Sequence, residues 1–195
     1  MIRFFDIVLS GIGLVILFPF FLILGIWIKI DSKGSVFYKQ QRVGKGGVDF
    51  SLFKFRSMYL DSDKKGLITI GNNDPRVTPS GYFIRKYKLD ELPQLINVFL
   101  GNMSIVGPRP EVRKYVSLYN AGQMAVLSIR PGVTDYASIA FSNENEILSN
   151  VSNPEQYYIE VIMPEKLKLN MSYIQNRNIF QYFKIIVITL VKLIC

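Results

Sequence analysis

Two adjacent carboxylates, Asp90 and Glu91, follow a short basic stretch in this 195-residue chain. Arg85, Lys86 and Lys88 supply its positive charge. A carboxylate in a positive field stays ionised, and it then acts as a nucleophile or as a ligand of Mg²⁺, which takes one or two carboxylates together with phosphate oxygens. An acidic pair at a helix start also complements the helix dipole without any chemical role. The basic neighbours favour the chemical interpretation.

Three further cations are candidates for binding phosphate. Arg109 stands between two prolines in the segment 107–110, and this rigid, extended setting pre-organises a guanidinium for bidentate contact. Lys54 and Arg56 lie two residues apart on a predicted strand and therefore share one face. Taken singly, these features are typical of a surface turn and a solvated strand face. Beside the carboxylate pair, they predict a phosphate site.

The composition excludes several other chemistries. The chain has no histidine, so neither a histidine base nor a histidine-ligated zinc is available. A single cysteine leaves no intrachain disulfide. The formal net charge of +8 favours an anionic partner such as nucleic acid, a phosphorylated substrate or acidic lipid. Nucleic acid does not account for the uncharged segment described next, so we expect no nucleic-acid partner.

An apolar segment near the N-terminus predicts a membrane anchor over residues 1–30. No residue from 7 to 28 is charged, and a helix of that length rises about 33 Å, the thickness of a hydrocarbon core. The run is too long for a signal peptide, and no small-residue cleavage site follows it. Pro19 either kinks a spanning helix or turns it back so that both ends emerge on one face. Arg3 before the segment and lysines after it favour two cytoplasmic ends.

Residues 31–195 are predicted to form one domain of mixed α and β structure, predominantly α. The expected elements are strands over 36–40 and 49–58, a turn at 44–47, a long loop over 61–81, a helix from Leu89 to Gly101 with Asp90 as its N-cap, a helix over 111–127, a turn at 130–132, and helices over 154–171 and 181–193. Pro164 is expected to interrupt or restart the first of the last two helices. The final helix fits either the core or the membrane interface.

Several short motifs follow one another along the chain. They are Arg3-Phe4-Phe5-Asp6, Lys54-Phe55-Arg56-Ser57-Met58, Asp74-Pro75-Arg76-Val77-Thr78, Leu89-Asp90-Glu91-Leu92-Pro93-Gln94-Leu95, Gly101-Asn102-Met103-Ser104-Ile105-Val106-Gly107-Pro108-Arg109-Pro110 and Arg130-Pro131-Gly132-Val133-Thr134. In this order and spacing, most of the chain resembles the minimal catalytic unit of the bacterial sugar transferase family, the monotopic phosphoglycosyl transferases.

The resemblance implies an activity. It implies a phosphoglycosyl transferase that moves sugar-1-phosphate from a UDP-sugar to polyprenol phosphate (undecaprenyl phosphate) and releases UMP. That reaction begins the assembly of a lipid-linked glycan such as a capsule, an O-antigen, an exopolysaccharide or a glycoprotein. The implied partners are these two substrates and membrane lipid, and the resemblance also allows a homo-oligomer and downstream glycosyltransferases.

The resemblance also implies roles and a fold. Asp90 would attack the β-phosphate and form a covalent phosphosugar intermediate, and Glu91 would hold Mg²⁺ together with Asp90. Arg85 and Arg109 would lie near the phosphates. Pro19 matches the proline that turns a re-entrant membrane helix, which packs on a small cytoplasmic globular domain with short strands and amphipathic interfacial helices. The implied location is the bacterial inner (cytoplasmic) membrane, with the catalytic domain on the cytoplasmic face.

Three sites depart from the family pattern. Phe18 stands where a serine often precedes the proline, Asn102 replaces an aspartate, and Asp135-Tyr136 replace a glycine and a tryptophan. Sugar specificity therefore cannot be carried over. The alternative interpretation is a non-catalytic, membrane-anchored basic protein that binds acidic lipid or a partner glycosyltransferase, and release of UMP from a UDP-sugar distinguishes the two.

Overall fold

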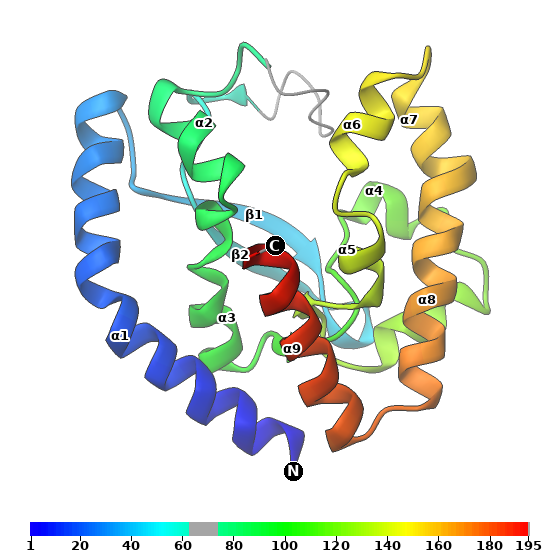
Figure 1. Cartoon of the computed structure of the whole chain (residues 1–195). Coiled ribbons are helices and arrows are strands. Elements are labelled where there is room, and N and C mark those ends of the chain that lie inside the picture. The colour runs from blue at the N-terminus through cyan, green and yellow to red at the C-terminus, as the bar shows by residue number, and fades with distance from the viewer. Residues whose placement is uncertain (63–73, 195) are drawn as a thin grey trace.

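The computed structural model describes residues 1–62 and 74–194. Figure 1 shows α1 along one side and α8 along the opposite side, with α2, α3 and a β-hairpin between them. The α-helices are α1 (Ile2–Asp31), α2 (Pro79–Lys86), α3 (Gln94–Leu100), α4 (Arg113–Val116), α5 (Tyr136–Ala140), α6 (Glu144–Ser149), α7 (Pro154–Tyr157), α8 (Met163–Gln175) and α9 (Ile179–Ile194). The other elements are the strands β1 (Phe37–Val43), β2 (Asp49–Phe55), β3 (Ser104–Val106) and β4 (Gly132–Thr134), the 3₁₀ turns η1 (Lys45–Gly47), η3 (Leu89–Glu91) and η4 (Gln123–Ser128), and the π-helical turn η5 (Tyr158–Ile162).

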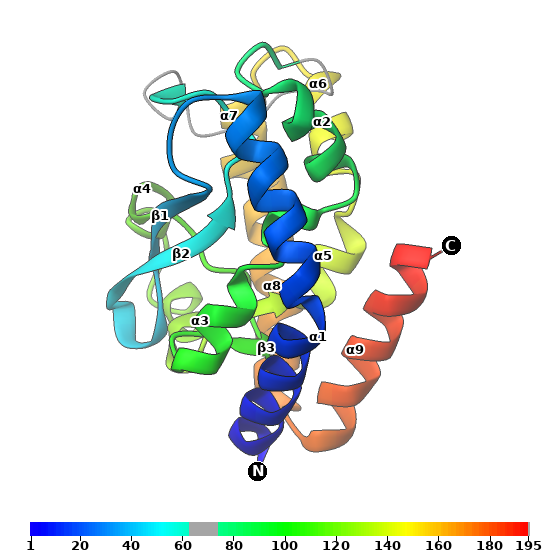
Figure 2. The same cartoon turned by 90° about the vertical axis from the view of Figure 1, so that its left-hand side faces the viewer.

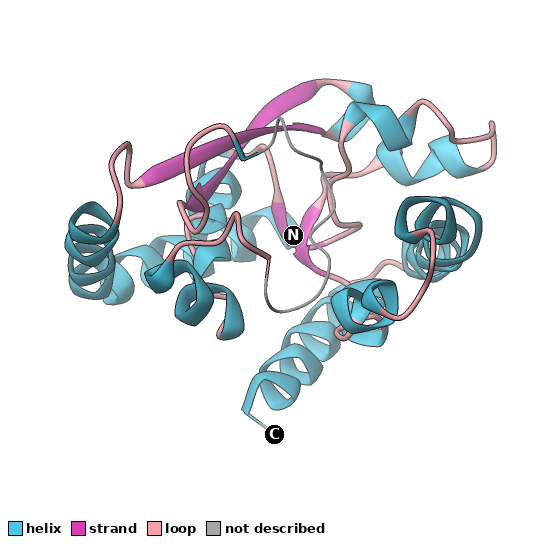
Figure 3. Ribbon diagram, turned by 90° about the horizontal axis from the view of Figure 1, so that it is seen from above, coloured by secondary structure: helices cyan, strands magenta, loops and turns pink. Residues whose placement is uncertain are grey.

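The strands β1 and β2 form an antiparallel hairpin that confirms the first predicted strands and their turn. The register runs from Phe37 opposite Phe55 to Val43 opposite Asp49. In the turn, Gly46 and Gly47 have φ of +68° and +78°, a region that glycine enters without strain. Figure 3 shows the long hairpin strands at one edge of the molecule when it is seen from above. The hairpin carries Lys54 near the end of β2.

The strands β3 and β4 form a parallel pair that the sequence did not predict. Ser104 lies opposite Gly132 and Val106 opposite Thr134. Each strand has only three residues, too few for an alternating pattern. The turn predicted at 130–132 is therefore wrong at Gly132, which begins β4. A Cβ there would lie 2.1 Å from the backbone nitrogen of Gly107, so the close approach of these two segments requires glycine.

The helices between residues 74 and 128 differ from the prediction. The loop predicted over 61–81 is wrong at its end, because α2 begins at Pro79, whereas residues 63–73 lie outside the described residues. Asp90 is not an N-cap: it lies inside η3, and α3 starts only after Pro93. Gly101 ends α3 with φ of +94°, as predicted. The single helix predicted over 111–127 is wrong, since α4 and η4 replace it.

The C-terminal half contains both confirmed and unpredicted helices. The short helices α5 and α6 were not predicted. The predicted helix over 154–171 is confirmed as the run α7, η5 and α8. Its wide π-helical turn ends just before Pro164, which has no N–H to donate to the preceding turn. Pro164 thus lies in the first turn of α8, which agrees with the predicted restart of the helix, and the helical run is not broken there.

The helix α1 continues through Pro19 as one helix. Figure 1 shows that it bends along its length, as expected where proline removes a hydrogen bond and its ring meets the preceding turn. By length and composition, α1 is able to cross a membrane, and only 11% of its most apolar window is buried. Its exposed apolar side chains include Ile12, Val15, Ile16, Phe18, Leu22, Ile23, Ile26 and Ile30. Pro19 therefore lies inside a continuous helix.

The N-terminal end of α1 is hydrogen-bonded to the rest of the fold. Arg3 donates to the carbonyl oxygens of Val98 and Phe99, at 2.6 and 2.9 Å, and so caps α3. Asp6 is 2% exposed. Its Oδ1 accepts hydrogen bonds of 2.9 Å from Ser104 Oγ, from the Ile105 amide and from Tyr182 Oη. Asp6 therefore joins α1, β3 and α9 at one buried point.

We expect Asp6→Ala to lower the free energy of unfolding by about 3 kcal/mol, because three buried donors lose their acceptor at once. Asp6→Asn keeps one acceptor oxygen and is expected to lower the free energy of unfolding by less. Chemical unfolding of the detergent-solubilised protein measures both changes. Equal stability of Asp6→Ala and the unmodified protein would contradict this account.

The C-terminal end of α1 is also tied to the body. Arg56 donates to the carbonyl oxygens of Lys33, Ile28 and Ser32, at 2.7, 3.1 and 2.7 Å. Asp31 Oδ2 accepts from the amide and the hydroxyl of Ser80 on α2, at 3.1 and 2.7 Å. Both ends of α1 therefore contact the same folded body. The division of the chain at residue 30 stays a prediction.

The last helix, α9, has two different faces, and Figure 2 shows it standing at the outer side of the body. Tyr182 and Ile185 are fully buried and pack with Val106 and Tyr173. On the other face, Phe180, Val187, Leu190 and Val191 are exposed. One face thus belongs to the core, while the exposed apolar face has the character expected at a membrane interface.

Candidate active site

The carboxylate pair lies in η3, the single turn between α2 and α3. Lys88 precedes the turn with φ of +53°, a left-handed conformation that sends the chain sharply from α2 into η3. Asp90 is 7% exposed, whereas Glu91 is half-buried. The two carboxylates have different partners, and this difference defines the site.

Glu91 forms ion pairs with two cations from distant segments. Arg109 donates through Nη1 to Oε2 at 3.1 Å and through Nη2 to Oε1, a bidentate arrangement. Lys54 Nζ lies 3.6 Å from Oε1. Burial opposes the ionisation of Glu91, but Arg109 and Lys54 outweigh it and hold the pKa of this carboxyl well below its usual range. Glu91 is therefore a fixed anion between two cations.

Asp90 has a different environment. Among residues 1–62 and 74–194, no hydrogen bond or ion pair is formed with its carboxylate. Burial raises its pKa against the opposing charge of Lys54, and the neighbouring Glu91 raises it further. Arg85 on α2 and Arg109, like Lys54, lower the pKa of Asp90. Asp90 is thus a buried carboxylate in the field of three cations, with both oxygens available to a ligand.

Two adjacent strand ends position Arg109. It follows β3, and Asp135 follows β4, so the parallel pairing brings both to the same edge. The buried Asp135 accepts a hydrogen bond from the Arg109 amide at 2.9 Å and also caps α5. Sequence reasoning noted Asp135 only as a departure from the family pattern. The available signal was that aspartate is a preferred N-cap residue, and the prediction did not use it.

Arg56 lies elsewhere. Its guanidinium donates to carbonyl oxygens at the C-terminal end of α1, where a cation also complements the helix dipole. The sequence grouped it with Lys54 because the two residues are spaced to share a strand face. Arg56 is therefore not part of the candidate phosphate site, which keeps Lys54, Arg85 and Arg109.

The donor set is compatible with Mg²⁺ only when substrate supplies ligands. Within the described part of the chain, no three acidic, histidine or cysteine side chains gather. Mg²⁺ commonly uses one or two carboxylates and completes its shell with phosphate oxygens and water. Asp90 has both oxygens available, and Glu91 lies beside it in the same turn. The pair fits a magnesium ion that arrives with a phosphorylated substrate.

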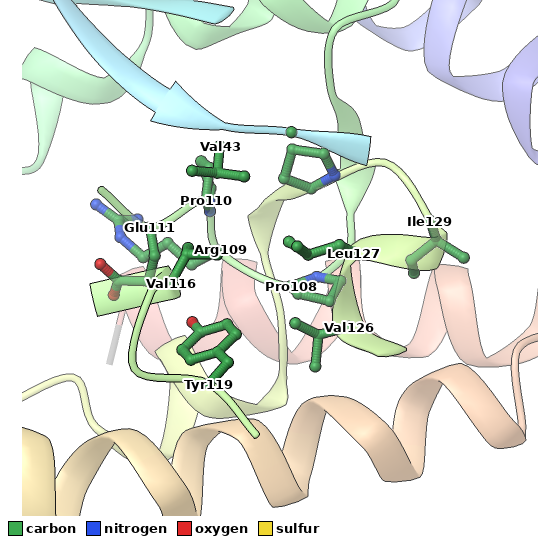
Figure 4. Close-up of a pocket in the computed structure, with 12 residues that line it drawn as sticks. Val43, Pro108, Arg109, Pro110, Glu111, Val116, Tyr119, Val126, Leu127 and Ile129 are labelled. Carbon is green, nitrogen blue, oxygen red and sulfur yellow. The ribbon is translucent and has the colours of Figure 1, made fainter. Parts of the chain in front are cut away.

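A small pocket lies beside the Pro108–Pro110 segment, and Figure 4 shows its lining. The lining is mostly apolar and includes Pro108, Pro110, Val126, Leu127 and Ile129. Neither Asp90 nor Glu91 contributes to it. Arg109 also lines it, so the pocket lies beside the segment that carries Arg109 and does not include the two carboxylates themselves.

If Asp90 is the nucleophile that the family resemblance implies, we expect the acidic limb of the pH profile for turnover to lie above the ordinary aspartate pKa, because burial raises the pKa of Asp90. Lys54→Met removes the strongest opposing charge and is expected to move this limb to still higher pH. Initial rates of the two proteins between pH 5 and 9 measure the shift. A limb that stays in place or moves to lower pH would contradict the assignment.

A long apolar helix joined at both ends to a small mixed domain, with a carboxylate pair among three cations, defines a membrane-associated protein suited to phosphate chemistry. The model of the family described as bacterial sugar transferase matches residues 1–195. The chain belongs to this family, which confirms the resemblance inferred from its motifs.

Three curated relatives illustrate the similarity. A Bacillus subtilis protein provisionally named undecaprenyl-phosphate N-acetylgalactosaminyl 1-phosphate transferase is 49% identical over 109 residues, which is 56% of this chain and 61% of that protein. The UDP-N-acetylgalactosamine-undecaprenyl-phosphate N-acetylgalactosaminephosphotransferase of Aeromonas hydrophila is 44% identical, over 59% of this chain and 27% of its own length. The UDP-glucose:undecaprenyl-phosphate glucose-1-phosphate transferase of Klebsiella pneumoniae is 34% identical, over 96% of this chain and 38% of its own length. The chain thus spans less than two thirds of each of these relatives.

Proposed function

We propose that the chain transfers sugar-1-phosphate from a UDP-sugar to undecaprenyl phosphate at a membrane and releases UMP. Membership of the bacterial sugar transferase family and the names of the relatives support the substrate classes. The observation that carries the proposal is the unequal carboxylate pair: Asp90 has no hydrogen-bonded partner among the described residues, while Glu91 is held by Arg109 and Lys54. The relatives' names specify different sugars, so the proposal names only the class of donor.

The proposed reaction has two balanced steps at one phosphorus atom. An Asp90 oxygen attacks the β-phosphorus, the bond from that phosphorus to the oxygen bridging the two phosphates breaks, and UMP leaves with the bond's electrons. An oxygen of undecaprenyl phosphate then attacks the same phosphorus and displaces the Asp90 carboxylate. The product is an undecaprenyl diphosphate sugar, and Asp90 returns to its starting state.

The cations around Asp90 suit the charge that develops on the phosphoryl oxygens. Lys54, Arg85 and Arg109 come from β2, α2 and the segment after β3, and rigid elements hold them before substrate arrives. Arg109 presents a planar fork that matches two phosphate oxygens. We further propose that Asp90 and Glu91 hold Mg²⁺, which would neutralise part of the diphosphate charge.

We propose that both ends of α1 lie on the cytoplasmic side and that its exposed apolar face enters the membrane. The hydrogen bonds of Arg3 and Asp6 at one end, and those of Asp31 at the other, all lead to the same body and support this topology. A cysteine introduced at residue 2 is expected to resist labelling by an impermeant reagent in intact cells. Labelling from outside would favour a spanning anchor.

The test is UMP release by the purified chain with Mg²⁺, undecaprenyl phosphate and a panel of UDP-sugars. We expect release with at least one donor and its loss on chelation of the metal. A matched control is Asp49→Asn, which changes a half-exposed carboxylate on the hairpin. If the folded protein binds acidic vesicles but releases no UMP with any donor, the non-catalytic alternative is favoured.

A further inference from the structure

A second polar cluster lies next to the Pro108–Pro110 segment, outside the carboxylate site. It consists of Arg42 at the end of β1, Glu111 directly after Pro110, and Tyr158 in η5. The side chains of Arg42 and Glu111 are 16% and 15% exposed, and Tyr158 is 4% exposed. Polar groups buried to this degree cost free energy unless they are hydrogen-bonded, so their partners indicate what the cluster holds in place.

Most of these partners belong to the chain segment that carries Arg109. Arg42 Nη1 donates to the carbonyl oxygen of Pro110 at 3.0 Å and lies 3.5 Å from Glu111 Oε2. The Val43 amide donates to the carbonyl oxygen of Glu111 at 2.8 Å. Figure 4 shows Val43, Pro110 and Glu111 together with Arg109 beneath the β1 strand. The segment is therefore fixed to β1 on the C-terminal side of Arg109.

Tyr158 completes the cluster from the other half of the fold. Its hydroxyl donates to Glu111 Oε1. Burial and the adjacent Glu111 raise the pKa of Tyr158, so the phenol stays protonated and remains a donor. The widened turn η5, next to Pro164, supplies this tyrosine. Glu111 thereby uses one carboxylate oxygen for Arg42 and the other for Tyr158.

We propose that Glu111 and Tyr158 are positioning residues that set the orientation of Arg109 toward the Asp90–Glu91 pair. Asp135 holds the Arg109 amide on one side of the residue, and the Arg42–Glu111–Tyr158 cluster holds the chain on the other. Two fixed points on either side of one arginine leave its backbone little freedom. The expected effect on kcat rests on the proposed function. The expected effect on the backbone around Arg109 does not.

The negative charge of Glu111 has a second role, because it acts on two arginines. Arg42 and Arg109 repel each other, and Glu111 attracts both. Without the Glu111 charge, two guanidinium groups would face each other in a poorly hydrated region, and the more exposed Arg109 would move away. A displacement of about 1 Å at a phosphate-binding group is enough to lower a rate by up to about 100-fold.

The first test compares two tyrosines in one cluster. Tyr158→Phe removes the hydroxyl that donates to Glu111, whereas Tyr115→Phe removes one that lies 3.4 Å from Glu155 Oε1. The two rings contact each other, with centroids 5.0 Å apart, and both tyrosines are 4% exposed. We expect kcat to fall about tenfold in Tyr158→Phe, with a smaller change in the KM for the donor, and to stay unchanged in Tyr115→Phe.

Combining variants distinguishes a positioning role of Tyr158 from a merely structural one. In an Arg109→Lys background, where the bidentate contact is already lost, Tyr158→Phe is expected to lower kcat by much less than tenfold. Glu111→Gln, which keeps an acceptor for Tyr158 but removes the charge, is expected to lower kcat in the unmodified background. Equal losses from Tyr158→Phe in both backgrounds would overturn the positioning role.

A readout without substrate keeps this inference separate from the proposed function. The amides of Gly107 and Arg109 are hydrogen-bonded to Thr134 and Asp135. Tyr158→Phe is expected to speed hydrogen exchange in the peptide spanning 107–112, and Tyr115→Phe is not. Unchanged exchange in Tyr158→Phe would overturn the inference even if the enzyme is active. Faster exchange in a protein that releases no UMP would refute the proposed function alone.

Discussion

Asp90→Asn is expected to lower UMP release by a factor on the order of 10⁴ or more, because Asp90 is the proposed nucleophile and an amide oxygen cannot replace its carboxylate. The fold is expected to persist, since the two side chains have nearly the same shape. Burial already disfavours the charged form of Asp90, as the raised pKa indicates. A group whose pKa is raised by folding stabilises the fold at low pH and loses that contribution as the pH rises through the raised pKa. At neutral pH, Asp90→Asn should therefore be at least as stable as the unmodified protein.

The measurement combines UMP release with thermal unfolding of the same preparation. Asp49→Asn serves as the control, because the exposed Asp49 of β2 pairs with the exposed Arg113 of α4, and loss of this pair should affect neither quantity strongly. Clear residual turnover by Asp90→Asn would refute the nucleophile assignment. Loss of turnover together with a much lower unfolding temperature would show that Asp90 serves the fold.

Arg109→Met is expected to have the second large effect, on stability and activity together. It leaves the half-buried Glu91 with Lys54 as its remaining ion-pair partner in the described residues. Loss of one partner from such a pair lowers the free energy of unfolding by more than the intact pair contributes to it. We expect a decrease of about 2 kcal/mol here, since both side chains keep some contact with solvent. UMP release should fall by about 10³-fold, because the guanidinium is also the proposed phosphate ligand.

A second substitution separates these two effects. Glu91→Gln in the Arg109→Met background removes the stranded charge, so most of the lost stability should return while turnover stays low. Denaturant unfolding and UMP release of the two single variants and the double variant provide the full cycle. If the double variant is no more stable than Arg109→Met, the stranded charge of Glu91 is not the cause of the loss.

Local signals in the sequence determined a definite part of the fold. Glycines that tolerate positive φ marked the hairpin turn and the end of α3, and Pro164 marked the junction of η5 and α8. The uncharged run marked α1. The glycine and proline signals predict structure correctly because their steric effects act on the backbone within a few residues. The three-residue strands β3 and β4 gave no such signal, since each is stable only through the other.

The sequence alone also determined the family and the chemical candidates, because the Asp90–Glu91 pair and its cations occur in recognisable motifs. Only the tertiary structure decided which partner each side chain has. Glu91 is paired with Arg109, 18 residues away, whereas Asp90 keeps its oxygens available. Arg56 caps α1, and Asp6 joins elements up to 176 residues apart. Ion pairs and buried hydrogen bonds depend on distances of a few ångströms between separate segments, and spacing along the chain does not specify those distances.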